Sequence, residues 1–97
     1  MVRFEWDDQK NESNRRKHGY SFDTAALVFD DPHCLIFPER NEAGEMRWHA
    51  IGAVESSLLF LTVVHTYNEQ GAVQIARIIS ARRATNHEKR LYAEAIF

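Results

Sequence analysis

The sequence has little cysteine, proline or glycine: one cysteine, two prolines and four glycines in 97 residues. A single thiol, Cys34, cannot form an internal disulfide, so we expect a reducing cytoplasmic environment. The sequence lacks an apolar run long enough to span a membrane, and its first residues lack the apolar stretch of a secretory signal. We therefore expect one small globular domain over residues 1–97, without contact to a membrane.

The familiar spacings of metal and nucleophile motifs are also absent. The histidines are far apart, and there is no H-x-x-x-H, C-x-x-C, G-x-S-x-G or glycine-rich phosphate loop. Cys34 lies in an apolar run, which is more typical of a core residue than of a nucleophile. We expect neither a metal nor an organic cofactor, while a Ser–His–Asp or Cys–His arrangement assembled by the fold stays open.

Charge is present in both signs, with a formal net charge of −2. Residues 21–46 are mostly acidic and residues 71–97 mostly basic. Long-range attraction of a polyanion would therefore be weak, although a local anion site remains open. The alternative for each charge cluster is a solvated face.

The N-terminal part predicts a strand at residues 4–6 followed by two helices. Residues 8–18 are polar on every side, but Asp7 or Asp8 suits the N-cap and Gly19 suits the left-handed position after the last turn. Ser21 can cap a second helix, in which apolar residues at 22, 25, 26 and 29 share one face, and Asp30-Asp31-Pro32 ends it.

The remainder changes to strand-like patterns joined by short connections. Strands are expected at residues 34–37, 48–54, 58–64 and 73–81, with a polar connection at 39–46 and turns at 55–57 and 67–71. Thr85 and Glu88 form a capping box before a final helix at residues 86–96. The sequence thus predicts an α+β fold: a small antiparallel β-meander with helices near the N-terminus and one at the C-terminus.

Arginine on the last strand suggests phosphate chemistry. Arg77 lies between isoleucines in mid-strand, and Arg82 and Arg83 follow at the strand end. The planar guanidinium fork can bond two phosphate oxygens at once. In an ideal strand Arg83 would share the face of Arg77 and Arg82 would not, unless a bulge or the strand end intervenes. The alternative is an arginine paired with a neighbouring carboxylate.

Histidine and lysine supply further candidates. His65 ends the most apolar strand and His49 lies in mid-strand, and imidazole is the natural proton carrier near neutral pH. A hydrogen-bonded core or edge histidine is the alternative for each. Lys17 and His18, which follow Arg15 and Arg16, could dock a phosphate backbone or could be solvated.

Taken in order, these residues resemble a known family. The carrying segments are Phe4-Glu5-Trp6-Asp7, Lys10, Asn14, Lys17-His18-Gly19, Ser21-Phe22, Gly44-Glu45-x-Arg47, Ile51-Gly52, Val63-Val64-His65-Thr66, Arg77 to Thr85 and Glu88-x-Arg90-x-Tyr92. They are similar to the pattern of BrnT toxins and span nearly the whole chain.

The resemblance implies a RelE-like ribonuclease fold in a type II toxin–antitoxin pair. It implies a BrnA-like antitoxin with a ribbon-helix-helix domain, which neutralises the toxin and binds operator DNA for the complex. Because ribbon-helix-helix domains dimerise, it also implies a dimer within the complex. It implies metal-independent RNA cleavage, in which the ribose 2′-OH attacks the adjacent phosphate. By position, Arg77 and Arg82 would act on phosphate and His65 or His49 in proton transfer. The residues expected to hold RNA are Lys17, His18, Arg47 and Arg83.

Two features depart from the family pattern. Residues 67–72 carry no cation where related chains often have an arginine, and the net charge is low for an RNA-cleaving toxin. Both favour an alternative, a catalytically degenerate homologue that binds antitoxin and supports operon repression. A third hypothesis is an unrelated small structural domain.

Overall fold

A computed structural model describes residues 2–40, 44, 46–54 and 59–96. The elements are β1 (Val2–Glu5), α1 (Asp8–His18), α2 (Phe22–Ala26), the 3-10 helix η1 (Leu27–Asp30), β2 (Leu35–Arg40), β3 (Met46–Val54), β4 (Leu59–Gln70), β5 (Val73–Arg83) and α4 (Asn86–Ile96). Among the described helices, none is long and apolar enough to cross a membrane.

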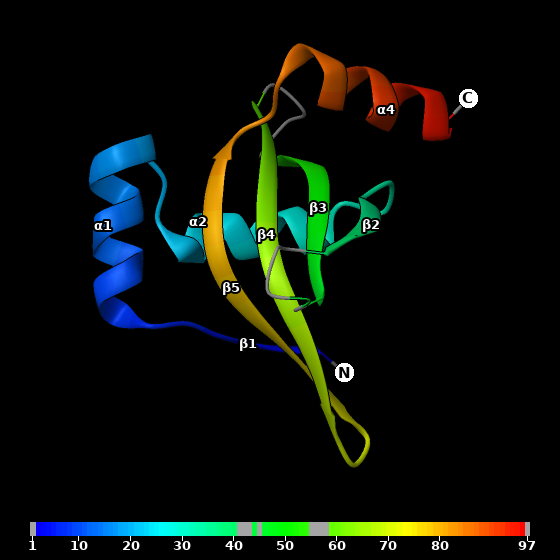
Figure 1. The fold of residues 1–97 in the computed structure, drawn as a ribbon. Helices are drawn as coiled ribbons and strands as arrows, with labels where there is room; N and C mark the ends of the chain where they lie inside the picture. Colours follow the sequence, from blue (N-terminus) through cyan, green and yellow to red (C-terminus); the bar gives the residue numbers. More distant parts are fainter. Residues whose placement is uncertain (1, 41–43, 45, 55–58, 97) are drawn as a thin grey trace.

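The α+β fold is confirmed. The five strands form one sheet in the order β1-β5-β4-β3-β2. From β2 to β5 each strand pairs antiparallel with the next, as a meander, whereas β1 joins β5 in parallel. In Figure 1, α1 lies beside β5, α2 lies behind the sheet, and α4 lies across one end of it.

One face of the sheet, called here the helix face, packs on α2 and η1. Phe22, Ala25 and Val28 are fully buried there. The expected second helix holds only to Ala26, because the chain then tightens into η1. In a 3-10 helix, residues three apart lie on one side, so Val28 follows Ala25 into the core and is fully buried. Phe29, which the sequence places on the buried face, is only partly buried.

Strands β2 to β5 are all longer than expected; β3 begins already at Met46 and β5 ends only at Arg83. Strand β4 continues to Gln70, so the turn to β5 is only Gly71 and Ala72 rather than residues 67–71. Gly71 has a φ of 64°, the left-handed conformation that such tight hairpins need. Strand β2 continues through Pro38, which a strand at the sheet edge tolerates. The expected turn at 55–57 lies outside the described residues, as do residues 41–43 and 45 of the connection expected at 39–46.

A β-bulge in β5 decides which arginines share a face. Val64 of β4 pairs with Ser80, but the next residue, His65, pairs with Ile78, so Ile79 is left over. The extra residue shifts the alternation of side chains along β5. Arg82 and Arg77, whose partners are Thr62 and Thr66, therefore lie on one face, called here the open face.

Arg83 pairs with Leu61 of the helix-face core. The expectation from an ideal strand, that Arg83 would share the face of Arg77, is therefore wrong.

Helix α1 is attached to β5 by one buried amide. The Asn14 side chain donates to the Ala81 carbonyl at 2.8 Å and accepts from the Ala81 N–H at 3.1 Å. It also donates to the Tyr20 carbonyl at 3.0 Å. The amide thus pairs with β5 beyond the point where β1 ends. This explains how a helix with no apolar stripe is held on the sheet.

We expect Asn14→Ala to lower the free energy of unfolding by about 2–4 kcal/mol, because it leaves the buried Ala81 backbone groups without partners. Ser13→Ala, an exposed neighbour on the same helix, is the control and should change stability by less than about 0.5 kcal/mol. Urea unfolding monitored by tryptophan fluorescence measures both. Equal effects would show that the amide does not hold α1.

His65 is fully buried on the helix face, where its ring meets Phe29 and Tyr67 edge-on. Its Nδ1 lies 3.4 Å from the Val63 carbonyl oxygen. Burial lowers the pKa of His65 to about 4, from an ordinary value of 6.5. His65 is therefore a neutral core residue at pH 7, and the structure does not place it with the arginines of the open face.

The buried imidazole should make stability depend on pH. As the pH falls below about 6.5, His65 becomes protonated in the unfolded chain but stays neutral in the folded protein. The free energy of unfolding therefore decreases between pH 6.5 and about 4. The loss should be on the order of 3 kcal/mol. We expect His65→Leu to flatten this part of the profile in urea unfolding. The exposed control His33→Gln should retain the wild-type slope, and a wild-type slope in His65→Leu would contradict the assignment.

Candidate active site

Helix α4 covers one end of the open face and leaves the rest accessible. Its Tyr92 packs with Ile51 and Phe60, and the Tyr92 hydroxyl donates to Asp31 at 2.6 Å. Asp31 also accepts from the Ala53 N–H at 2.8 Å. These contacts fix the second half of α4 on the sheet, and polar side chains gather at its first turn, next to the end of β5.

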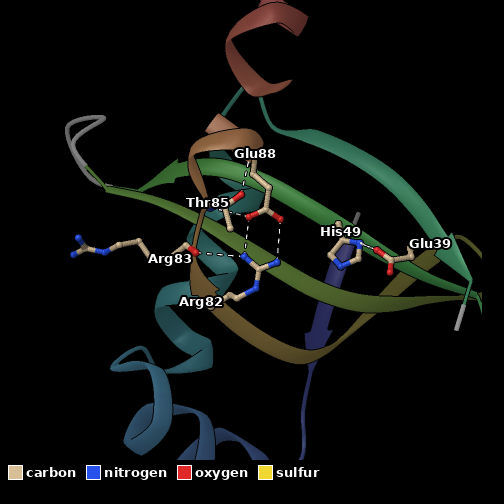
Figure 2. A network of polar contacts seen from close by, with 6 residues as sticks. All are labelled: Glu39, His49, Arg82, Arg83, Thr85 and Glu88. Atoms are coloured by element: carbon tan, nitrogen blue, oxygen red, sulfur yellow. Dashed lines mark hydrogen bonds and ion pairs between the residues drawn. The ribbon is translucent and has the colours of Figure 1, made fainter. Parts of the chain in front are cut away.

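Arg82 and Glu88 form the centre of this region (Figure 2). Arg82 Nη1 and Nη2 donate to the two Glu88 carboxylate oxygens at 2.7 and 3.0 Å. The predicted capping box is also present, since Glu88 accepts from the Thr85 N–H and the Glu88 N–H donates to the Thr85 hydroxyl. One carboxylate therefore both caps α4 and fixes the plane of the guanidinium group.

The charge of this pair is held firmly. Burial alone would raise the pKa of Glu88, but hydrogen bonds from Arg82 and from the Thr85 N–H outweigh it and lower the pKa to about 2. The same hydrogen bond raises the pKa of Arg82. Both groups are charged throughout the physiological range.

His49 lies on the same face with a carboxylate behind it. Its Nδ1 is 3.0 Å from Glu39 Oε2, and its ring stacks on Phe37 with centroids 5.3 Å apart. The contact with Glu39 is within ion-pair distance but does not have the geometry of a hydrogen bond. Figure 2 shows His49 and Glu39 to one side of the Arg82–Glu88 pair. Glu39 and Phe37 orient the imidazole, whose side chain is only 13% exposed.

Two neighbouring cavities join these side chains into one groove, called here the open-face groove. The larger, about 220 Å³, is lined by Phe37, Glu39, His49, Arg82, His87, Glu88 and Leu91. The smaller, about 180 Å³, is lined by Glu39, Arg47, His49 and Val64. Because Glu39 and His49 line both, the groove brings two arginines and two histidines together over β2, β3, β4, β5 and α4.

The remaining predicted site residues lie elsewhere. Arg77 shares the open face with Arg82, but it is exposed, contacts Glu5 at 3.4 Å, and lies roughly 13 Å along the strand. Arg83 points away from the groove (Figure 2). Its Nε lies 3.2 Å from the Tyr20 hydroxyl. Lys17 and His18 line a different cavity, between α1 and β5.

Three groove residues were missed as functional residues by sequence reasoning. The sequence pattern indicates only a helix cap at Glu88, although a cap next to an arginine-rich strand end is itself a signal. His87 has no spacing that marks it. Glu39 lies in the acidic middle segment, where its pairing with His49 depends on strand register. Among the described residues, no three histidine, cysteine, aspartate or glutamate side chains are grouped as a metal site would require.

Fold and groove define a class: a small α+β domain with fixed cations and imidazoles on an exposed sheet face, suited to an anionic substrate. A family model described as ribonuclease toxin, BrnT, of type II toxin-antitoxin system matches residues 6–88. The chain belongs to this family, and is therefore the ribonuclease toxin partner of an antitoxin. The matched segment includes every groove residue except Leu91. No curated protein matches the chain.

The two hydrogen bonds from Arg82 to the Glu88 carboxylate, called here the clamp, can be tested by the titration of Glu88. In Arg82→Gln the strongest hydrogen bonds to the carboxylate are lost, so we expect its pKa to rise from about 2 by about one unit or more. Carboxyl-carbon NMR of Glu88 measures this directly. Arg83→Gln, which removes the neighbouring guanidinium on the other face, should leave the titration unchanged. An unchanged midpoint in Arg82→Gln would rule out the clamp.

Proposed function

We propose that this protein is a metal-independent RNA endonuclease that acts in the cytoplasm and inhibits translation until a BrnA-like antitoxin blocks it. The observation that carries the proposal is the open-face groove, in which a fixed guanidinium group shares a cavity with two imidazoles. In the reaction, the ribose 2′-OH would attack the adjacent phosphorus, the 5′-oxygen would leave, and a 2′,3′-cyclic phosphate would form.

Arg82 is suited to stabilise the charged phosphorane. A guanidinium group has five N–H donors. Glu88 takes one each from Nη1 and Nη2, and the Arg83 carbonyl lies 3.4 Å from Nη1. No contact between described residues takes the Nε–H or the second Nη2 hydrogen, so both can donate to phosphate oxygens. Because Glu88 fixes the plane in advance, little reorganisation is needed in the transition state.

His49 and His87 are the candidates for proton transfer. Glu39 lies against Nδ1 of His49, which leaves Nε2 to accept the proton of the 2′-OH. The same carboxylate would stabilise the imidazolium that forms. His87, on α4, is exposed and lines the same cavity, and it would donate a proton to the leaving 5′-oxygen.

Other cations would position the RNA strand. Arg47 lines the smaller cavity beside His49, and Arg77 lies farther along the same face, where it suits a neighbouring phosphate. We leave His65 out of the catalytic set because it is buried on the helix face. We leave Arg83 out of the RNA-binding set because it points away from the groove.

The antitoxin follows from family membership, and its type is part of the proposal. A BrnA-like antitoxin would supply a ribbon-helix-helix domain, through which alone the complex contacts operator DNA. Since such domains dimerise, we expect two toxin chains in the complex.

Mutation of the groove tests the endonuclease. We expect Arg82→Gln, His49→Asn and His87→Asn each to reduce RNA cleavage by about 10²-fold or more while the protein stays folded. Arg83→Gln, the matched arginine on the opposite face, should cleave normally. Purified protein is assayed on synthetic RNA with and without EDTA, and growth is followed on induction with and without antitoxin. Full activity in the groove variants, or loss of cleavage in EDTA, would contradict the proposal.

One observation favours a second function. Glu88 and Glu39 place two carboxylates among the groove cations, which lowers the net positive charge offered to RNA. A catalytically degenerate toxin would bind antitoxin and support repression without cleaving RNA. Unimpaired growth at confirmed expression, together with tight antitoxin binding, would establish this alternative.

A further inference from the structure

Helix α1 faces the sheet with a stripe of polar residues. Lys10, Ser13, Asn14 and Lys17, at positions i, i+3, i+4 and i+7, lie on one side of the helix. With His18, Ile79 and Ser80 they line a cavity of about 240 Å³ between α1 and β5. A helix normally packs on a sheet through apolar residues at these positions, so lysines here leave a cationic groove, called here the α1–β5 groove.

Two features keep this groove open. Asn14 holds the helix by hydrogen bonds to Ala81, so close apolar packing is not needed. The bulge at Ile79 re-aims the neighbouring residues of β5 at the same place. The cationic string 15–18 is divided as a result: Arg15 and Arg16 pair with Glu12 away from the groove, while Lys17 and His18 line it.

The α1–β5 groove adjoins the open-face groove. Ser80 lies two residues from Arg82 on β5 and on the same face, a separation of roughly 7 Å. Its cross-strand partner is Val64, which lines the smaller cavity of the open-face groove with Arg47. A strand of RNA leaving Arg82 along β5 would therefore reach the lysines of α1.

We infer that the α1–β5 groove is a phosphate subsite for the RNA strand that flanks the cleaved bond. Lys10 and Lys17 supply the charge, and the Ser13 and Ser80 hydroxyls supply short donors to phosphate oxygens. This inference rests on the proposed ribonuclease function. It assigns the substrate class as single-stranded RNA longer than a dinucleotide. A dinucleotide would fill only the open-face groove, and a longer strand is needed to reach the α1–β5 groove as well.

Binding of an RNA that cannot be cleaved separates the subsite from the chemistry. We would measure fluorescence anisotropy of a 2′-O-methyl oligonucleotide and of a 2′-O-methyl dinucleotide with the whole protein. For Lys10→Gln/Lys17→Gln we expect the Kd of the long oligonucleotide to rise about tenfold, with a shallower salt dependence by about one phosphate contact. The Kd of the dinucleotide should stay unchanged.

The matched control is Arg15→Gln/Arg16→Gln, which removes the same charge from the other side of the same helix. Its Kd should stay within about twofold of wild type after allowance for general electrostatics. Ser13→Glu, which puts a negative charge in the groove, should weaken binding as the lysine variant does. Equal weakening in the two double variants, or in neither, would overturn the subsite.

The outcomes also separate this inference from the proposed function. A protein that binds the long oligonucleotide through the lysines but cleaves no RNA supports the subsite and defeats the endonuclease. If the wild-type protein cleaves RNA but the lysine variant binds the long oligonucleotide as the arginine control does, the subsite is wrong and the proposed endonuclease function stands. If the lysine variant loses antitoxin binding and keeps RNA binding, the groove belongs to the protein partner and the subsite is wrong.

Discussion

The structure depends on one amide, that of Asn14. Helix α1 has no apolar face, so burial of hydrocarbon cannot hold it, and its position is fixed by hydrogen bonds between Asn14 and the Ala81 backbone. Strand β1 pairs with β5 only as far as Arg77, and the amide satisfies part of the edge that β1 leaves open. Directional bonds at a single point hold the helix without filling the space beside it. That is why the groove between α1 and β5 can be lined by lysines.

The bulge at Ile79 has the second largest consequence, because one extra residue changes the face to which each later side chain points. Without it Arg82 would face the helix-covered core and Arg83 would take its place. With it Arg82 reaches the open-face groove, and Arg83 lies next to Tyr20. Bulges are common near active sites because they re-aim a side chain at the cost of only one unpaired residue.

Glu88 couples the formation of α4 to the orientation of Arg82 in the open-face groove. The carboxylate that satisfies the Thr85 N–H at the start of α4 is the one that fixes Arg82. Docking of α4 is completed by Tyr92, whose hydroxyl reaches Asp31 between η1 and β2. The cationic site therefore assembles only when the C-terminal helix has folded onto the sheet. This coupling also explains why a net charge of −2 does not preclude an anion site, since local hydrogen bonds rather than overall charge set its electrostatics.

The sequence by itself determined the α+β class, the meander, the caps at Gly19 and Thr85, and the family, because hydrophobic period, capping and turn chemistry act between residues near in the chain. It left the N-cap of α1 open between Asp7 and Asp8, and the structure places it at Asp7. The sequence also singled out Arg77, Arg82 and His49. Only the tertiary structure decided which face each residue occupies. The bulge puts Arg82 on the open face and Arg83 on the helix face, the opposite of an ideal strand. Burial makes His65 a neutral core residue, and strand register places Glu39 next to His49. These outcomes depend on contacts between segments distant in the chain, and a shift of one residue in register moves a side chain to the opposite face.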